Sequence, residues 1–278
     1  MSHCQDVADI LEIADHPNPD ARCFLVRLKD GCTQDDLARR LAIYMAATLT
    51  AGSESAFNAW RSRFDGGPPL TSEDRDELAA YLMADLKPPK GSDDHATRLV
   101  GAVVEHLWSA ISEHLDGDWG KPMHVERDHF SVLDPGGDGL ALYEHVYADL
   151  SFRLWESKRH TGEGSVTSVA TNAAGQLKDN GAEYLARLSK PLQTHADYRV
   201  RQLAGRIVRL WTAKDGRSAV GVSVGTSTGS KMPNRPLRGL VKTLGFPERE
   251  RYEGVVLVLD DLPKFANNVR DAILSGAS

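Results

Sequence analysis

Two carboxylates and a lysine occur where a β-hairpin would bring them together. Asp138 lies in the stretch 137–143, and Glu156 and Lys158 end the alternating run 149–158. Because successive strand side chains point to opposite faces, Glu156 and Lys158 share a face with the apolar residues of that run, Leu150, Phe152 and Leu154. The apolar side chains can bury the face, so the carboxylate and ammonium emerge at its rim, where Asp138 of the neighbouring strand converges. Such a group suits a divalent cation acting on a phosphodiester.

This arrangement resembles the signature of the PD-(D/E)xK nuclease superfamily, in which an acidic residue opens one strand and Glu-x-Lys closes the next. The usual proline before the aspartate is absent, and the nearby Asp134-Pro135 pair has the reverse order, which makes Asp134 a weaker candidate. The chain length, the helical first third and the mid-chain hairpin resemble more narrowly the HamA effector nucleases of the Hachiman anti-phage defence system. That resemblance implies DNA as the substrate and a partner helicase, HamB, that holds the nuclease inactive.

The resemblance also assigns roles to the residues of the hairpin. Asp138 and Glu156 are expected to bind Mg²⁺ or Mn²⁺, with the Ser157 carbonyl completing the protein ligands. Lys158 is expected to hold the attacking water or a phosphate oxygen. A compact ammonium is suited to this role, and the broad planar fork of an arginine is not.

Two further residues become accessory candidates through the same resemblance. Some members carry an acidic residue on the first core helix, which corresponds to Glu105, and a glutamine on the helix after Glu-x-Lys, which corresponds to Gln176. A solvated glutamate at the border of an apolar stripe is the commoner explanation for a residue placed like Glu105. An amide that caps a nearby backbone group is the alternative for Gln176.

Other interpretations of the hairpin stay open. Acidic-x-Lys triplets arise by chance because Glu and Lys are common, and 85–87 is one such triplet at the end of a helical pattern. Glu156 and Lys158 would then be a weak surface ion pair on an ordinary hairpin. The chain would be a catalytically silent docking or regulatory subunit of a DNA-processing complex, or an α/β regulatory domain without a nucleic-acid role.

Length and local patterns favour an α/β fold with a mixed central sheet flanked by helices. The chain has 278 residues, enough for one large domain or a domain with a helical extension. The segment 88–92, rich in Pro and Gly, divides a mostly helical N-terminal part, 1–90, from a restriction-endonuclease-like core, 91–278. Strands are predicted at 23–28, 218–223 and 254–259, and helices after Thr33, after Thr71 or Ser72, and over 95–115, 166–188 and 200–211, with a terminal helix.

Charge and composition limit the classes of partner. The net charge of -6 argues against a protein that coats DNA, but a nuclease needs only a local basic segment. The best candidate for contact with a DNA backbone or a partner contains Lys231, Arg235, Arg238 and Lys242. The sequence shows no apolar run of membrane-spanning length, so we expect no membrane partner and a cytoplasmic location. Three cysteines, all within the first 32 residues, make a disulfide framework or a Cys-x-x-Cys zinc site unexpected.

Overall fold

The computed structural model describes residues 7–83, 86, 95–127, 138–144, 149–162, 164–230 and 232–278. In chain order its elements are β1 (Leu11–Asp15), β2 (Arg22–Leu28), α2 (Gln34–Leu49), α3 (Glu54–Phe64), α4 (Ser72–Leu78), the π-helical segment η1 (Ala79–Met83), α6 (His95–Ser112), β3 (His124–Arg127), β4 (Gly139–Glu144), β5 (Leu150–His160), α7 (Val166–Leu192), α8 (Tyr198–Ala204), α9 (Ile207–Thr212), β6 (Ser218–Ser227), α10 (Arg238–Leu244), the 3-10 turn η3 (Arg249–Arg251), β7 (Tyr252–Leu259) and α11 (Leu262–Gly276).

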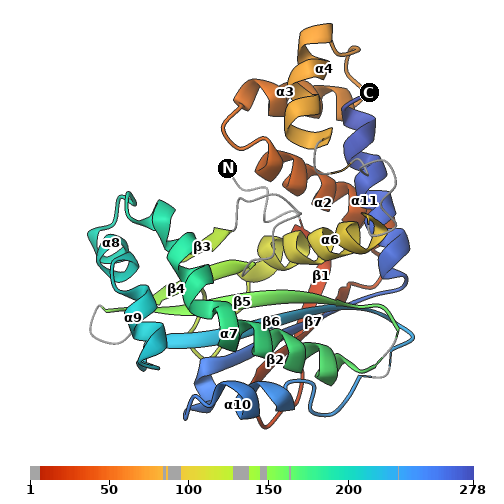
Figure 1. Cartoon of the computed structure of the whole chain (residues 1–278). Coiled ribbons are helices and arrows are strands. Elements are labelled where there is room, and N and C mark those ends of the chain that lie inside the picture. The colour runs from red at the N-terminus through yellow and green to blue at the C-terminus, as the bar shows by residue number, and fades with distance from the viewer. Residues whose placement is uncertain are drawn as a thin grey trace.

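A seven-stranded mixed sheet in the order β1-β2-β7-β6-β5-β4-β3 forms the centre of the described structure. In the stretch β2-β7-β6-β5 every neighbouring pair is parallel. The outer pairs β1–β2, β5–β4 and β4–β3 are antiparallel. Helices cover both faces (Figure 1). The predicted α/β class with a mixed, helix-flanked sheet is therefore confirmed.

Each face of the sheet closes its own hydrophobic core. Helices α2, α3, α6 and α11 pack with one set of strand side chains, which includes Trp155 and Val255. Helices α7, α8, α9 and α10 pack with the other set, which includes Leu154 and Val256. Adjacent residues of β5 and β7 thus enter different cores, as the two-residue period of a strand requires. Both strands are central and need apolar side chains on both faces.

Predicted helix starts are confirmed where the sequence carries a cap. Thr33 and Thr71 each form a capping box with the aspartate three residues later, and α2 and α4 begin immediately after them. The single helix predicted over 200–211 is wrong, because the chain forms α8 and α9, and Gly205 caps the end of α8. Glycine is a poor helix former, and Arg206 there leaves the helical conformation.

Helix α3 and the C-terminal helix α11 pack together in the part of the molecule that lies above the sheet in Figure 1. Trp60 of α3 donates a hydrogen bond from Nε1 to the carbonyl oxygen of Ile273 in α11, at 2.8 Å. A Cβ atom at Gly276 would lie 2.6 Å from the same indole, so glycine permits this close packing. Strands β1 and β2 belong to the central sheet. The boundary between two parts of the chain that was predicted near residue 90 stays a prediction. Two strands of residues 1–90 belong to the same sheet as the strands of residues 91–278.

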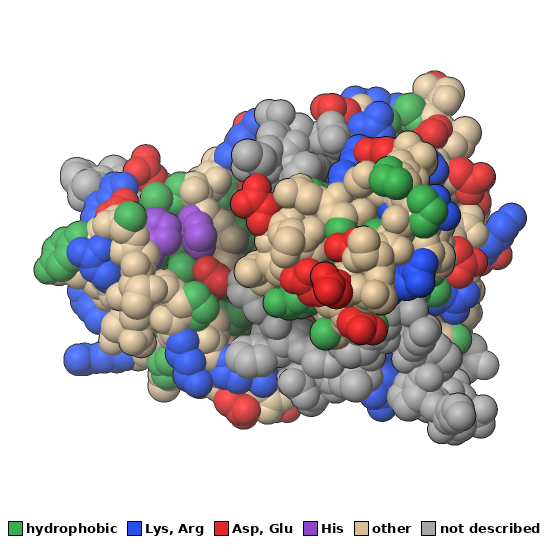
Figure 2. Space-filling view, turned by 90° about the horizontal axis from the view of Figure 1, so that it is seen from above, with side chains coloured by type: hydrophobic (Ala, Val, Ile, Leu, Met, Phe, Trp, Pro, Cys, Tyr) green, Lys and Arg blue, Asp and Glu red, His purple; other side chains and the backbone are tan. Residues whose placement is uncertain are grey.

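One face of the molecule mixes charges of both signs. In Figure 2 the acidic and basic side chains are interspersed over the coloured part of the face seen from above. Within the described residues, no helix is long and apolar enough to cross a membrane.

Candidate active site at the β4–β5 hairpin

The hairpin brings Asp138 close to Glu156. In the antiparallel pair β4–β5, Gly139 is the partner of Trp155, and the backbone N–H of Asp138 donates to the carbonyl oxygen of Trp155 at 3.1 Å. The carboxylate of Asp138, just before β4, accepts the backbone N–H of Ser157, and the charge of Glu156 acts on it. The predicted convergence of these two acids is therefore present.

Tight packing on the opposite face fixes this register. Gly139 faces the ring of Trp108 in α6, where an added Cβ would lie 2.3 Å from a ring carbon. The Trp108 and Trp155 rings pack with their centroids 5.3 Å apart, and Gly221 of β6 leaves room for Trp155 in the same way. The Asp-Gly order at the start of β4 thus has a structural reason: the glycine admits the indole, and the aspartate before it accepts the N–H of Ser157.

Lys158 and Ser157 hold the two carboxylates in place. The Lys158 Nζ lies 2.5 Å from Oε1 of Glu156, and the backbone N–H of Ser157 donates to the Asp138 carboxylate. Glu156 is only 2% exposed, whereas the Lys158 side chain is 29% exposed. The lysine therefore lies between a buried acid and the surface, where a substrate can reach it.

The electrostatics of the group are those of crowded acids. Burial raises the pKa of the Asp138 carboxyl well above its usual range, and the charges of Glu156 and Glu105 raise it further. Burial also raises the pKa of Glu156, against the opposing influence of Lys158. Burial alone would lower the pKa of the Lys158 ammonium, but Glu156 outweighs that effect and raises it. Strongly perturbed groups that share one site are typical of functional centres.

The donor set fits a divalent cation of the magnesium type. Oε2 of Glu156 is buried and has no hydrogen-bond partner among the described residues, and the charges of Glu156, Glu105 and Lys158 all act on Asp138. A cation would place positive charge beside the buried carboxylates of Asp138 and Glu156. Within the described part of the chain no three His, Cys, Asp or Glu side chains are close enough to form a metal cluster by themselves. Mg²⁺ is commonly bound by one or two carboxylates, with waters and substrate phosphate completing its shell.

The accessory candidates have different positions. Glu105 is half-buried on α6, and its charge acts on Asp138. Gln176 is exposed on α7, whose sheet-facing residues include Ala173 and Leu177. Its predicted role near the hairpin stays a prediction. Asp134 lies outside the described residues, as does the acidic-x-Lys aspartate at position 85.

The predicted basic segment is partly neutralised within the protein. Arg235 forms a two-pronged ion pair with Asp20, in which its Nε lies 2.8 Å from Oδ2. Arg238 and Lys242 are exposed on α10, four residues apart and therefore on one side of the helix. Lys231 lies outside the described residues. Arg238 and Lys242 thus present exposed positive charge on one side of α10.

Two residues near the site were not predicted from the sequence. His160 extends the alternation of Glu156 and Lys158 by one more step on the same strand face, a signal that the sequence contains. Tyr184 of α7 lies close enough that the Glu156 charge, after burial, contributes to raising its pKa. No local pattern could have indicated Tyr184, because the contact depends on how α7 crosses β5.

Comparison with models of known protein families finds no match, and comparison with curated proteins finds none.

Proposed function

We propose that the protein is a metal-dependent DNA nuclease that hydrolyses phosphodiester bonds. The observation that carries the proposal is the geometry of one hairpin: Asp138 lies close to Glu156, and Lys158 contacts Glu156 at 2.5 Å. These are the residue types and the order that the resemblance to PD-(D/E)xK nucleases requires. Their buried charge, with the unpartnered Oε2 of Glu156, also supports a cation site.

Each residue has a defined task in this reaction. Asp138 and Glu156 hold the cation, and the Ser157 N–H keeps the Asp138 carboxylate turned toward β5. Mg²⁺ or Mn²⁺, when bound, supplies positive charge beside the phosphate under attack. Lys158 donates a hydrogen bond to a phosphate oxygen or to the attacking water. As water adds to phosphorus, the bond to one bridging oxygen breaks; the water loses a proton to solvent and the leaving oxygen takes one up from solvent, which leaves a phosphate on one strand end and a hydroxyl on the other.

Incubation of the purified protein with plasmid and linear DNA tests the proposal. We expect cleavage with Mg²⁺ or Mn²⁺ and none with EDTA. Asp138→Ala, Glu156→Ala and Lys158→Ala should each reduce cleavage at least about a hundredfold while the protein stays folded. Glu144→Ala is the matched control, because this exposed acid at the far end of β4 pairs with Arg199. Wild-type cleavage by all three folded variants would overturn the site, and a protein inactive with both metals would favour a silent docking subunit.

We also propose that a partner helicase controls the nuclease in the cytoplasm, as effector of an anti-phage defence system. The support is the resemblance to HamA and the absence from the sequence of a helix-turn-helix or zinc-finger pattern that would select DNA. Residues 1–90 are the proposed docking region. Since β1 and β2 lie in the sheet, deletion of this region would remove two core strands. Charge reversal at the exposed Glu73 and Asp76 of α4 is the cleaner test of this docking region. The measurement is co-purification with the proposed partner helicase.

A further inference from the structure

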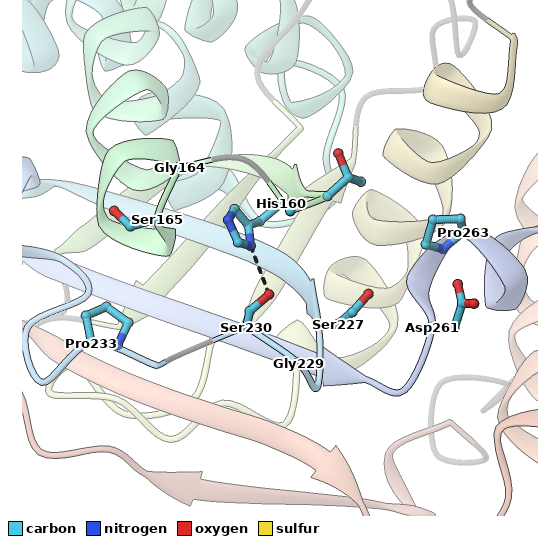
Figure 3. Close-up of a pocket in the computed structure, with 11 residues that line it drawn as sticks. His160, Gly164, Ser165, Ser227, Gly229, Ser230, Pro233, Asp261 and Pro263 are labelled. Atoms are coloured by element: carbon cyan, nitrogen blue, oxygen red, sulfur yellow. Dashed lines mark hydrogen bonds between the residues drawn. The ribbon is translucent and has the colours of Figure 1, made fainter.

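A cavity of about 670 Å³ opens where β5 and β6 end at their carboxyl termini. Its lining includes the last residue of each strand, His160 and Ser227, and the residues that cap the N-termini of α7 and α11, Ser165 and Asp261 (Figure 3). Ligands of open α/β sheets commonly bind outside the carboxyl ends of the strands. The volume is that of a nucleotide-sized site.

The two helix ends at this cavity differ in what they offer a ligand. At α11, Leu262 donates its N–H to Oγ of Ser227 at 3.2 Å, Lys264 donates to Asp261 at 2.9 Å, and Pro263 has no N–H. The Asp261 carboxylate adds a negative charge to that side. The N-terminus of α11 is therefore closed to an anion.

At α7 the capping box leaves two donors unused. The Ser165 hydroxyl accepts from the N–H of Ser168 at 3.2 Å, and the Ser168 hydroxyl accepts from the N–H of Ser165 at 3.1 Å. The N–H groups of Val166 and Thr167 have no acceptor among the described residues. Free N–H groups at the start of a helix of this length carry the positive end of its dipole and favour phosphate.

His160 provides an independent reason to expect a ligand. It is only 4% exposed, and its Nε2 is buried without a hydrogen-bond partner in the described part of the chain. Its Nδ1 lies 2.9 Å from Oγ1 of Thr226 and 3.3 Å from Oγ of Ser230. When the nearer hydroxyl, that of Thr226, donates to Nδ1, the proton of the neutral ring is on Nε2, which becomes a donor. Figure 3 shows the ring between Ser165 and Ser230, with its second nitrogen turned toward the α7 side.

We propose that this cavity binds the phosphate of a nucleotide at the N-terminus of α7, with the N–H groups of Val166 and Thr167 and Nε2 of His160 as donors. The remaining volume accommodates the attached nucleoside.

The location links this cavity to the hairpin site. His160 follows Lys158 by two residues on one strand face, a separation of about 6.6 Å along β5. Pro233, inside the predicted basic segment, also lines the cavity, and Thr167 donates from Oγ1 to the carbonyl oxygen of Arg235 at 3.3 Å. The assignment of the nucleotide to a DNA strand beside the cleaved phosphate rests on the proposed nuclease function. A free mononucleotide is the other source of the same chemistry.

Two substitutions each remove one of the three proposed donors, at residues whose side chains are buried. Val166→Pro deletes one N–H at the first helical position, where proline is well tolerated, and Ser165 already has the extended backbone (φ -134, ψ 155) that precedes proline. His160→Asn keeps a polar group near Thr226 and removes Nε2. The control is Glu54→Pro, an exposed first residue of α3 whose preceding cap, Ser53, is also extended.

The experiment measures ligand binding in the presence of EDTA. ¹⁵N–¹H spectra of the full chain are recorded during titration with sodium phosphate, with dTMP and with an oligothymidylate of eight nucleotides. We expect the Val166 and Thr167 amide signals to move and both variants to weaken binding about tenfold or more, while Glu54→Pro binds normally. Tighter binding of the oligonucleotide would identify the ligand as a phosphate of a DNA strand. Tighter binding of dTMP would identify it as a free nucleotide. Unmoved amides with every probe, or variants that bind like the control, would overturn the proposal. Because no metal is present, this result is independent of whether the hairpin cleaves DNA.

Discussion

The Lys158 Nζ lies 2.5 Å from Oε1 of Glu156, two residues earlier on the same strand face. The contact needs no other element to align it, since the strand repeat places both side chains together. What the fold adds is the burial of Glu156 and the approach of Asp138 from β4. A short local motif thereby becomes a site where three charges depend on one another.

Two replacements of Lys158 test separately whether cleavage needs its charge and whether it needs its shape. Lys158→Arg keeps a positive charge but introduces a planar fork, and Lys158→Met removes the charge and leaves Glu156 unpaired. We expect both to lower single-turnover cleavage at least about a hundredfold, with Lys158→Arg the more stable of the two in thermal unfolding. Cleavage by Lys158→Arg at the wild-type rate would show that only charge is needed there.

Neutralising Asp138 should stabilise the metal-free protein. Its raised folded-state pKa means that the native state binds more protons than the unfolded state between the ordinary value of 3.8 and the raised value. Stability therefore falls as pH rises through that window, and the carboxylate opposes folding above it. Asp138→Asn keeps an acceptor for the Ser157 N–H and removes this cost. We expect a higher melting temperature in EDTA at neutral pH, by about 2–4 °C for each kcal/mol gained.

Metal addition gives the matching control for this prediction. Mg²⁺ should raise the melting temperature of the wild type, because it binds the folded site, and should raise that of Asp138→Asn much less. An Asp138→Asn protein that melts below the wild type in EDTA would contradict the crowded-acid description.

The sequence could predict the hairpin because its signals are local. The alternation of β5 and the Asp-Gly opening of β4 are contained within about twenty residues, and the order of elements sufficed for the fold class. Caps such as Thr33 marked helix starts through their own neighbours. These features depend on backbone periods and short-range hydrogen bonds, which a sequence displays directly.

The remaining features depend on contacts between distant segments. The parallel pairing of β2 with β7 joins residues more than two hundred positions apart, and no pattern within either strand specifies its neighbour. The cavity likewise combines the ends of β5 and β6 with two helix starts. Strand β3 has four residues, too few to show a clear alternation of apolar and polar side chains. It was not predicted from the sequence, and neither were β1 and α3.

The buried pair Arg153–Glu253 should be the most sensitive ionic contact to break. Its charged atoms are 3.1 Å apart, and the two side chains are 0% and 1% exposed. Glu253→Gln leaves the Arg153 charge buried without its counterion, so we expect a loss of about 3–5 kcal/mol in the free energy of unfolding from urea titration. Glu248→Gln is the control, since Glu248 is exposed and Arg251 keeps its backbone partners. Equal effects of the two substitutions would contradict the prediction.

Charge reversal in the basic segment should show which residues contact DNA. Arg238 and Lys242 are exposed on α10, whereas Arg235 is held by Asp20. We therefore expect Arg238→Glu with Lys242→Glu to weaken DNA binding strongly and to reduce the salt dependence by about two units of slope in a log–log plot, one for each lost phosphate contact. Arg235→Glu should have a smaller effect. Asp20→Asn, which releases Arg235, should strengthen binding at low salt. Fluorescence anisotropy of labelled DNA over a range of salt concentrations measures all four proteins, and an unchanged slope in the double variant would exclude α10 from the DNA interface.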